Sequence, residues 1–308
     1  GLWFVTDRTI RATLEENAAA TVDVDLAGLA DIYASGRSEE ILGELMQCKR
    51  DELVIATKAY FATGDGPNDR GASRYHLIRA CEASLRRLQT DRVDIFYVHR
   101  FDDLASLEEV LRGLESLVQS GKILYPAFSN FAAWQVAKAL GISALRGWAP
   151  AVCIQPMYNL LKRQAEVELF PMAQSEGLAV FPYGTLGGGY LTGKYLDEGA
   201  TGRITESAMY QVRYGVPHYT ETARAFIALA RELGHHPVSL AIAWATSHPA
   251  VTAPLLGARN LEQLEPELRQ KVRLVYSTGC ADADVANTWL QLGATSYVSH
   301  PGRISASP

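Results

Sequence analysis

Short apolar runs rich in β-branched residues alternate along this chain with longer segments of helical periodicity. The run VDIFYVHR, residues 93–100, is almost continuously apolar, which is typical of a strand buried on both faces of a sheet. It lies between two amphipathic segments, 73–88 and 106–121, whose apolar residues recur every three or four positions. A chain that repeats strand and helix in this way is predicted to form a parallel sheet covered by helices.

The predicted helices carry start and stop signals. Ser73 and Ser106 occupy N-cap positions, Glu109 completes a capping-box pattern with Ser106, and Gly121 follows the last apolar position. The other elements expected, in chain order, are a strand near 22–27, a helix after Gly36 with Ser38 as its N-cap, strands at 51–60 and 122–130, a helix from Ala132, a strand at 151–159, a helix near 166–174, a strand at 178–184, helices near 220–233 and 238–247, and a strand at 251–256.

Strict alternation over most of 308 residues is compatible with an open, doubly wound sheet or with a closed barrel. An open sheet of this kind normally carries a GxGxxG dinucleotide fingerprint after its first strand, and the chain contains none. The sequence therefore favours an α/β fold of the (β/α)8 TIM-barrel type. Barrels of this length are commonly one unit, so residues 1–308 are expected to form a single domain.

The charge and hydropathy of the chain argue against nucleic acid and membranes as binding partners. The net charge of −5 comes without a basic run, so neither nucleic acid nor a membrane surface is expected to bind. No apolar run approaches the roughly 20 residues of a membrane helix, and the N-terminal GLWFVTDRTIR lacks the apolar core of a signal peptide. Four scattered cysteines without a CxxC pair are interpreted as buried thiols rather than disulfides or metal ligands. A cytoplasmic protein acting on a small molecule is predicted.

Three successive strand exits supply Tyr33, Lys58 and His99. In a barrel, the carboxyl ends of all strands meet at one mouth. A phenol ordinarily titrates near 10, so poising it near neutrality takes about three pKa units, or about 4 kcal/mol. A neighbouring ammonium stabilises the phenolate, and an imidazole can hydrogen-bond a substrate oxygen or relay a proton. Each residue alone is more often structural, but the combination indicates a proton-transfer site.

Further polar side chains follow the later strands, and a glycine-rich loop occupies 184–193. These strand-end residues are Arg100, Ser129, Asn130, Gln155, Tyr158, Asn159, Tyr183, Gly257 and Arg259.

Seven blocks, in order, resemble the aldo-keto reductases, which are NAD(P)H-dependent carbonyl reductases built on a (β/α)8 barrel. The resemblance covers about residues 1–268, and SNFAAWQ and QPMYNLL are most similar to the bacterial reductases of broad substrate range. The blocks are ADIYASGRSEEILG, VIATK, IRACEASLRRLQTDRVDIFYVHR, FSNFAAWQ, QPMYNLL, PYGTLGGGYLTGKY and LLGARNLEQLE.

The resemblance assigns roles to individual residues. It implies that Tyr33 protonates the carbonyl oxygen, that Lys58 lowers the pKa of Tyr33, and that His99 orients the substrate. A guanidinium at Arg259 suits the 2′-phosphate, so NADP(H) is favoured over NAD(H). The cofactor-binding residues it implies are Ser129, Asn130 and Gln155 for the nicotinamide carboxamide, Tyr183 beneath the nicotinamide ring, Gly184 and Leu186 in the pyrophosphate loop, and Gly257, Arg259, Gln263 and Glu267 towards the adenine.

The stretch before the tyrosine departs from the family pattern. Gly28 replaces an aspartate that pairs with the lysine in the family, and Asp31 matches a different family position. Lys58 then lacks its usual partner unless a neighbouring acid takes its place. Three functions therefore stay open: NADPH-dependent reduction of aldehydes or ketones, nucleotide binding by a sensor or subunit without turnover, and a non-redox lyase or dehydratase reaction that uses Tyr33 and His99.

Other departures are smaller or lie at the termini. Glu267 replaces an asparagine near the adenine, and Gly184-Thr185 replaces Ser-Pro; both are expected to loosen cofactor binding. The chain begins after the point where the family has its first barrel strand, and LQLGAT in the tail resembles that strand. One interpretation is a circular permutation in which residues 289–296 supply the first strand; the other is a divergent tail.

Overall fold

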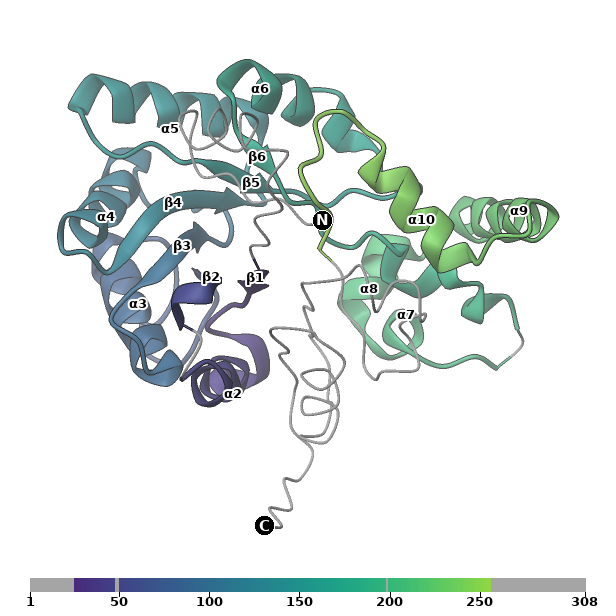
Figure 1. Ribbon diagram of the computed structural model, residues 1–308, viewed down its shortest axis with the longest axis horizontal. Helices are drawn as coiled ribbons and strands as arrows, with labels where there is room; N and C mark the ends of the chain where they lie inside the picture. The colour runs from purple at the N-terminus through teal and green to yellow at the C-terminus, as the bar shows by residue number, and fades with distance from the viewer. Residues whose placement is uncertain (1–24, 48–49, 198, 256–308) are drawn as a thin grey trace, which may run out of the picture.

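The protein is described from a computed structural model at residues 25–47, 50–197 and 199–255 (Figure 1). Within these residues the centre is a six-stranded parallel sheet whose strands neighbour one another in chain order. Residues 251–255, where a strand was predicted, are not assigned as a strand, but the amides of Thr252 and Leu255 donate to the carbonyls of Val180 and Pro182. The strands are β1 (Asp25–Gly28), β2 (Leu53–Ala59), β3 (Val93–Val98), β4 (Ile123–Ser129), β5 (Cys153–Gln155) and β6 (Ala179–Val180).

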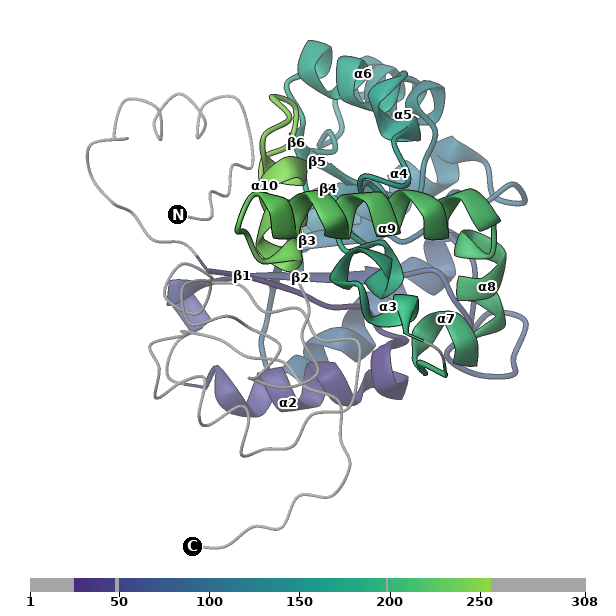
Figure 2. The ribbon, with the colours of Figure 1, turned by 90° about the vertical axis from the view of Figure 1, so that its right-hand side faces the viewer.

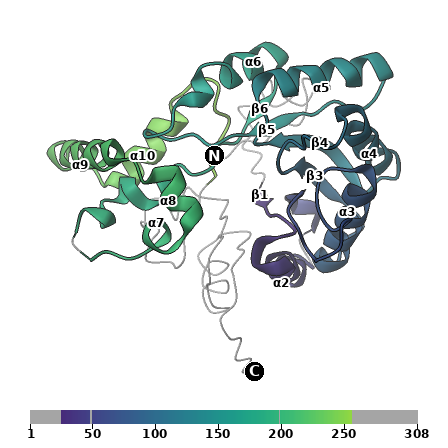
Figure 3. The same ribbon diagram turned by 180° about the vertical axis from the view of Figure 1, so that it is seen from behind.

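Helices follow the strands and cover the outer side of the curved sheet, as Figures 1 and 3 show for α2 to α6. The predicted (β/α)8 barrel class is confirmed, because the parallel sheet is curved and these helices lie on its outer side, whereas an open doubly wound sheet has helices on both faces. The α-helices are α2 (Arg37–Leu45), α3 (Arg74–Leu88), α4 (Leu107–Gln119), α5 (Ala133–Arg146), α6 (Leu169–Glu176), α7 (Arg203–Glu206), α8 (Ala208–Tyr214), α9 (Pro217–Glu232) and α10 (Pro237–Thr246). The 3-10 turns are η1 (Tyr33–Gly36), η2 (Arg50–Glu52), η3 (Gln164–Glu166), η4 (Gly187–Thr192) and η5 (Lys194–Leu196).

Both faces of the strands are buried, which explains their near-continuous apolar sequences. Ile55 and Phe96 pack outwards under the helices, whereas Ala56 and Tyr97 face the barrel interior. A third apolar cluster joins η4 to α9, and Figure 2 shows α9 beside α10 in front of the sheet.

The predicted N-cap serines were confirmed for α3 and α4, and the predicted N-cap was wrong for α2. Ser73 and Ser106 accept hydrogen bonds from the amides of His76 and Glu109, as N-caps do. Ser38 does not cap α2, because the cap is Gly36, whose φ of 89° is left-handed. A glycine adopts that conformation without a Cβ penalty, and Ser38 is consequently buried within the first turn.

Several predictions lie outside the described residues: the roles of Gly257, Arg259, Gln263 and Glu267, and the strand at 289–296. The single-domain assignment of 1–308 stays a prediction. Cys81 and Cys153 are free and buried, as expected. None of the helices in the described part of the chain has the length and apolar character required to cross a bilayer.

Candidate active site at the carboxyl ends of the strands

The exits of β1, β2 and β3 bring Tyr33, Lys58 and His99 together. Tyr33 begins η1 shortly after β1, Lys58 lies near the end of β2, and His99 follows β3. The Lys58 Nζ atom is 5.4 Å from the centroid of the Tyr33 ring. The rings of Tyr33 and His99 meet edge to face with their centroids 5.9 Å apart. A phenol, an amine and an imidazole thus lie together at the carboxyl ends of three neighbouring strands.

Lys58 is fully buried. Its Nζ donates a 2.7 Å hydrogen bond to the carbonyl of Leu29 and lies 5.5 Å from the centroid of the Tyr97 ring. Burial lowers the Lys58 pKa to about 7, and the carboxylates of Asp31 and Glu39 oppose that fall. The side chain is therefore poised to be charged or neutral near physiological pH.

His99 is a neutral imidazole at neutral pH. Burial, reinforced by the charge of Lys58, lowers its pKa to about 3. Phe61 packs against it edge to face with ring centroids 4.9 Å apart. A neutral imidazole has one donor nitrogen and one acceptor nitrogen, so it can donate a hydrogen bond to a carbonyl oxygen without adding charge.

Two buried carboxylates behind Lys58 were not predicted as site residues. Asp31 is 2% exposed, and its backbone amide donates to the Lys58 carbonyl at 3.0 Å. Glu39, on α2, accepts from the Thr57 hydroxyl at 2.5 Å and from the Arg87 Nε at 2.7 Å. Burial, with repulsion from Glu39, raises the Asp31 pKa to about 7. These groups surround the lysine with a network of buried charge.

A sequence signal for Glu39 existed. Glu39 is three and seven positions before the buried Leu42 and Met46, so it lies on the inner stripe of α2. An acid in the first turn of a helix is normally explained by the helix dipole, and that explanation does not require the side chain to be buried.

The residues predicted to hold the nicotinamide form one hydrogen-bonded row along the ends of β4 to β6. The Ser129 hydroxyl donates to the Gln155 carbonyl at 2.8 Å. The Asn130 amide nitrogen donates to the His99 carbonyl at 2.9 Å and to the Ser129 hydroxyl at 3.1 Å. The Tyr183 hydroxyl donates to the Asn130 amide oxygen at 2.7 Å. The structure thus brings these four residues next to His99.

The loop that contains Gly184 and Leu186 is tied to the barrel by Asn159. The amide nitrogen of Asn159 donates to the Gly184 carbonyl at 2.8 Å and to the Tyr214 hydroxyl at 3.1 Å. Gly184 has a φ of 74°, a left-handed conformation that a side chain would strain. Leu186 follows and caps η4. This loop begins directly after Tyr183, so the two predicted cofactor-binding segments are continuous in the chain.

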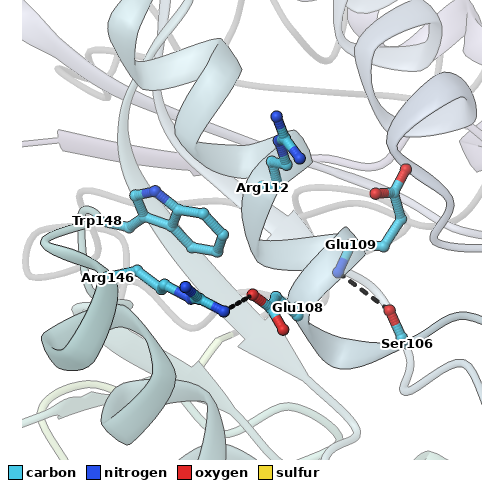
Figure 4. Close-up of a pocket in the computed structure, with 6 residues that line it drawn as sticks. All are labelled: Ser106, Glu108, Glu109, Arg112, Arg146 and Trp148. Atoms are coloured by element: carbon cyan, nitrogen blue, oxygen red, sulfur yellow. Dashed lines mark hydrogen bonds and ion pairs between the residues drawn. The ribbon is translucent and has the colours of Figure 1, made fainter.

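A separate groove of about 410 Å³ lies among the outer helices (Figure 4). It is lined by residues of α4, the end of α5 and their flanks, and Arg146 is paired with Glu108 across it at 2.5 Å. None of the residues predicted for the site lines this groove.

The sequence of this chain is similar to those of several known proteins. A model of the aldo/keto reductase family matches residues 6–277. A Bacillus subtilis protein named as an uncharacterized oxidoreductase, YrpG, is 36% identical over 251 residues, which is 78% of this chain and 76% of that protein. The L-glyceraldehyde 3-phosphate reductase of Escherichia coli K12 is 34% identical over 258 residues, 79% of this chain and 73% of that enzyme. A probable voltage-gated potassium channel subunit beta of Arabidopsis thaliana is 32% identical over 249 residues, 78% and 75% of the two chains.

Proposed function

This chain belongs to the aldo/keto reductase family, and from that premise we propose that it reduces aldehydes or ketones to alcohols with NADPH, using Tyr33 as the proton donor. The observation that carries the proposal is the convergence of Tyr33, Lys58 and His99 at the ends of three neighbouring strands. In this reaction the nicotinamide supplies a hydride to the carbonyl carbon. The Tyr33 hydroxyl supplies the proton to the carbonyl oxygen, so the product is an alcohol.

Lys58 and His99 have different roles beside Tyr33. The Lys58 side chain, when protonated, stabilises the phenolate that remains after Tyr33 has given up its proton. The neutral His99 donates a hydrogen bond that positions the carbonyl oxygen near the phenol. Both side chains are buried, so their interactions are stronger than they would be in water.

The residues at the ends of β4 to β6 fit a nicotinamide. A carboxamide offers one amide nitrogen and one carbonyl oxygen, and Ser129, Asn130 and Gln155 offer hydroxyl and amide partners for both. Tyr183 contributes an aromatic ring at the same edge. Arg259 supports the preference for NADP(H) over NAD(H) by its charge. The acceptor is proposed to be a small carbonyl compound in the cytoplasm.

The test is NADPH oxidation, followed by absorbance, with a panel of aldehydes and ketones. Replacing Tyr33 by Phe should lower kcat at least about 100-fold, because one general acid contributes about that much or more, while NADPH affinity is unchanged. Tyr75→Phe is the matched control, since Tyr75 lies on α3 and is 56% exposed. Full activity in the Tyr33 variant would rule out its role as proton donor.

A second candidate is a nucleotide-binding subunit that does not turn over substrate. Gly28 provides no carboxylate, and the Arabidopsis relative is named as a channel subunit. NADPH binding, measured by quenching of tryptophan fluorescence, without oxidation by any carbonyl of the panel would favour this candidate.

A further inference from the structure

We propose that Asp31 is the counter-charge of Lys58: a positioning residue that keeps the ammonium protonated beside Tyr33. The contribution to catalysis rests on the proposed reductase function, whereas the pairing of the two side chains does not.

The chain after β1 wraps around Lys58. The Leu29 carbonyl accepts from the Lys58 Nζ at 2.7 Å, and the Asp31 amide donates to the Lys58 carbonyl at 3.0 Å. Residues 29–31 are thereby held against both the backbone and the side-chain end of the lysine. The Asp31 carboxyl is attached to this segment and acts on the Lys58 ammonium as an attractive charge.

The Asp31 carboxyl is not committed to another partner. It is 2% exposed, and within the described part of the chain neither of its oxygens has a hydrogen-bond partner of good distance and angle, although the neighbouring Ile32 amide lowers its pKa. A buried polar group in this condition is costly unless a charge nearby compensates it. Among the described carboxylates, Asp31 exerts the largest attraction on Lys58, ahead of Glu39.

Glu39 attracts Lys58 less than Asp31 does, and Gly28 has no charge to offer. One oxygen of Glu39 accepts from Thr57 and the other from Arg87, with which Glu39 also forms an ion pair at 2.7 Å. Gly28 lies opposite Ala56 in the sheet, on the face that points into the barrel, and has no side chain. Among the described carboxyls that attract Lys58, Asp31 is therefore the one without a side-chain hydrogen-bond partner.

The charged groups around Asp31 come from three elements. Glu39 of α2 repels its charge, whereas Arg87 of α3 and Lys58 of β2 attract it. Lys58 in turn faces Tyr33 and His99. Burial is the largest cause in both cases: it raises the pKa of Asp31 to about 7 and lowers that of Lys58 to about 7, so both groups titrate near neutrality.

The direct test measures Lys58 itself, independently of turnover. The Lys58 Cε resonance, assigned by its loss in Lys58→Met, is titrated by carbon-13 NMR in the wild type and in Asp31→Asn. We expect the Lys58 pKa to fall by about one unit or more, a tenfold change in its protonation equilibrium. Glu40→Gln is the matched control, because Glu40 follows Glu39 on α2 but pairs with Arg37 at the surface. An unchanged Lys58 pKa in Asp31→Asn would overturn the proposal.

Two further measurements cover the case in which Asp31→Asn does not fold. In the wild type, the Asp31 carboxyl carbon and the Lys58 Cε should report the same apparent pKa values; independent titrations would contradict the pairing. The double variant Gly28→Asp/Asp31→Asn returns a carboxyl to the inward face of β1 and should raise the Lys58 pKa again.

Kinetics separate this inference from the proposed function. If the wild type is a reductase, the limb of its pH–rate profile that reports loss of the Lys58 proton should move to lower pH in Asp31→Asn by the unit or more seen in the titration. A wild type without reductase activity, combined with the expected Lys58 shift, would refute the function and leave the pairing. If the wild type is active, but neither the pH–rate profile nor the Lys58 pKa changes in Asp31→Asn, the pairing is refuted and the reductase function stands.

Discussion

Burial sets the protonation of both basic side chains at the ends of β2 and β3. For Lys58 and for His99, the loss of hydration is the largest cause of the lowered pKa, and the neighbouring charges only modify it. Because burial shifts these pKa values in the folded state, it also makes the stability of the fold depend on pH. Substitution of a single residue can test this dependence.

His99 should make the protein labile to acid. Its pKa is about 3 in the fold against an ordinary value of 6.5, so the unfolded chain binds the extra proton between these values and the stability is lost as the pH falls from about 6.5 to 3. His99→Asn should make the free energy of unfolding less dependent on pH between about 3 and 6.5. Urea unfolding at several pH values measures this free energy.

The control for this experiment is His218→Asn, because His218 is exposed on α9. The slope of unfolding free energy against pH should stay at the wild-type value in this control. Equal slopes for the wild type and His99→Asn would show that His99 does not carry the acid lability.

At the scale of elements, the close approach of α2 to α3 decides the position of Glu39. A Cβ on Gly43 of α2 would lie 2.6 Å from the Arg87 carbonyl oxygen and 2.8 Å from the Leu88 carbonyl carbon, both backbone atoms of α3. The two helices pack directly against each other (Figure 3). Glycine at this position therefore permits the contact that carries the buried ion pair between Glu39 and Arg87.

Gly43→Ala should destabilise the protein although alanine favours helix. The gain in helix propensity is about 1 kcal/mol, while forcing an extra carbon against rigid backbone costs about 1–3 kcal/mol and displaces Glu39 from Arg87. We expect the free energy of unfolding to fall by about 1–2 kcal/mol in urea titrations. A gain in stability would refute this account of the helix contact.

Gly141→Ala is the matched control within α5. A Cβ there would meet nothing within 4 Å among the described atoms. Gly141→Ala therefore changes only the helix propensity, and we expect the free energy of unfolding to rise by about 0.5–1 kcal/mol.

At the scale of the whole molecule, a cofactor that crosses the barrel mouth would link elements far apart in sequence. The row formed by Ser129, Asn130 and Tyr183 and the loop at Gly184 come from different βα units. A ligand that contacts them only in the folded state stabilises the fold through its binding free energy. Thermal stability is therefore a readout of cofactor binding that needs no substrate.

NADPH should raise the unfolding temperature more than NADH does. At a concentration of about 100 times its Kd, a ligand that binds one site on the native state raises the free energy of unfolding by about 2.7 kcal/mol. NADH, which lacks the 2′-phosphate, is the matched control, and differential scanning fluorimetry measures both. Equal shifts would contradict the NADP preference, and no shift with either would contradict the cofactor site.

Local pattern alone determined the order of strands and helices and much of the site. The segment 73–88 was expected to be helical, and α3 spans Arg74–Leu88, because its periodicity and its Ser73 cap are encoded within the segment. Tyr33, Lys58 and His99 could be grouped from the sequence, because parallel strands in a barrel end at one mouth.

Only the tertiary structure decided the electrostatics of that mouth. Nothing local distinguishes Ser38 from Gly36 as the cap of α2, and no spacing rule joins Glu39 to Arg87, which comes from the next helix. Whether Asp31 is a surface acid or a buried partner of Lys58 depends on how the chain after β1 folds over β2. Protonation follows from hydration and from distances between charges, and these exist only once the elements have packed.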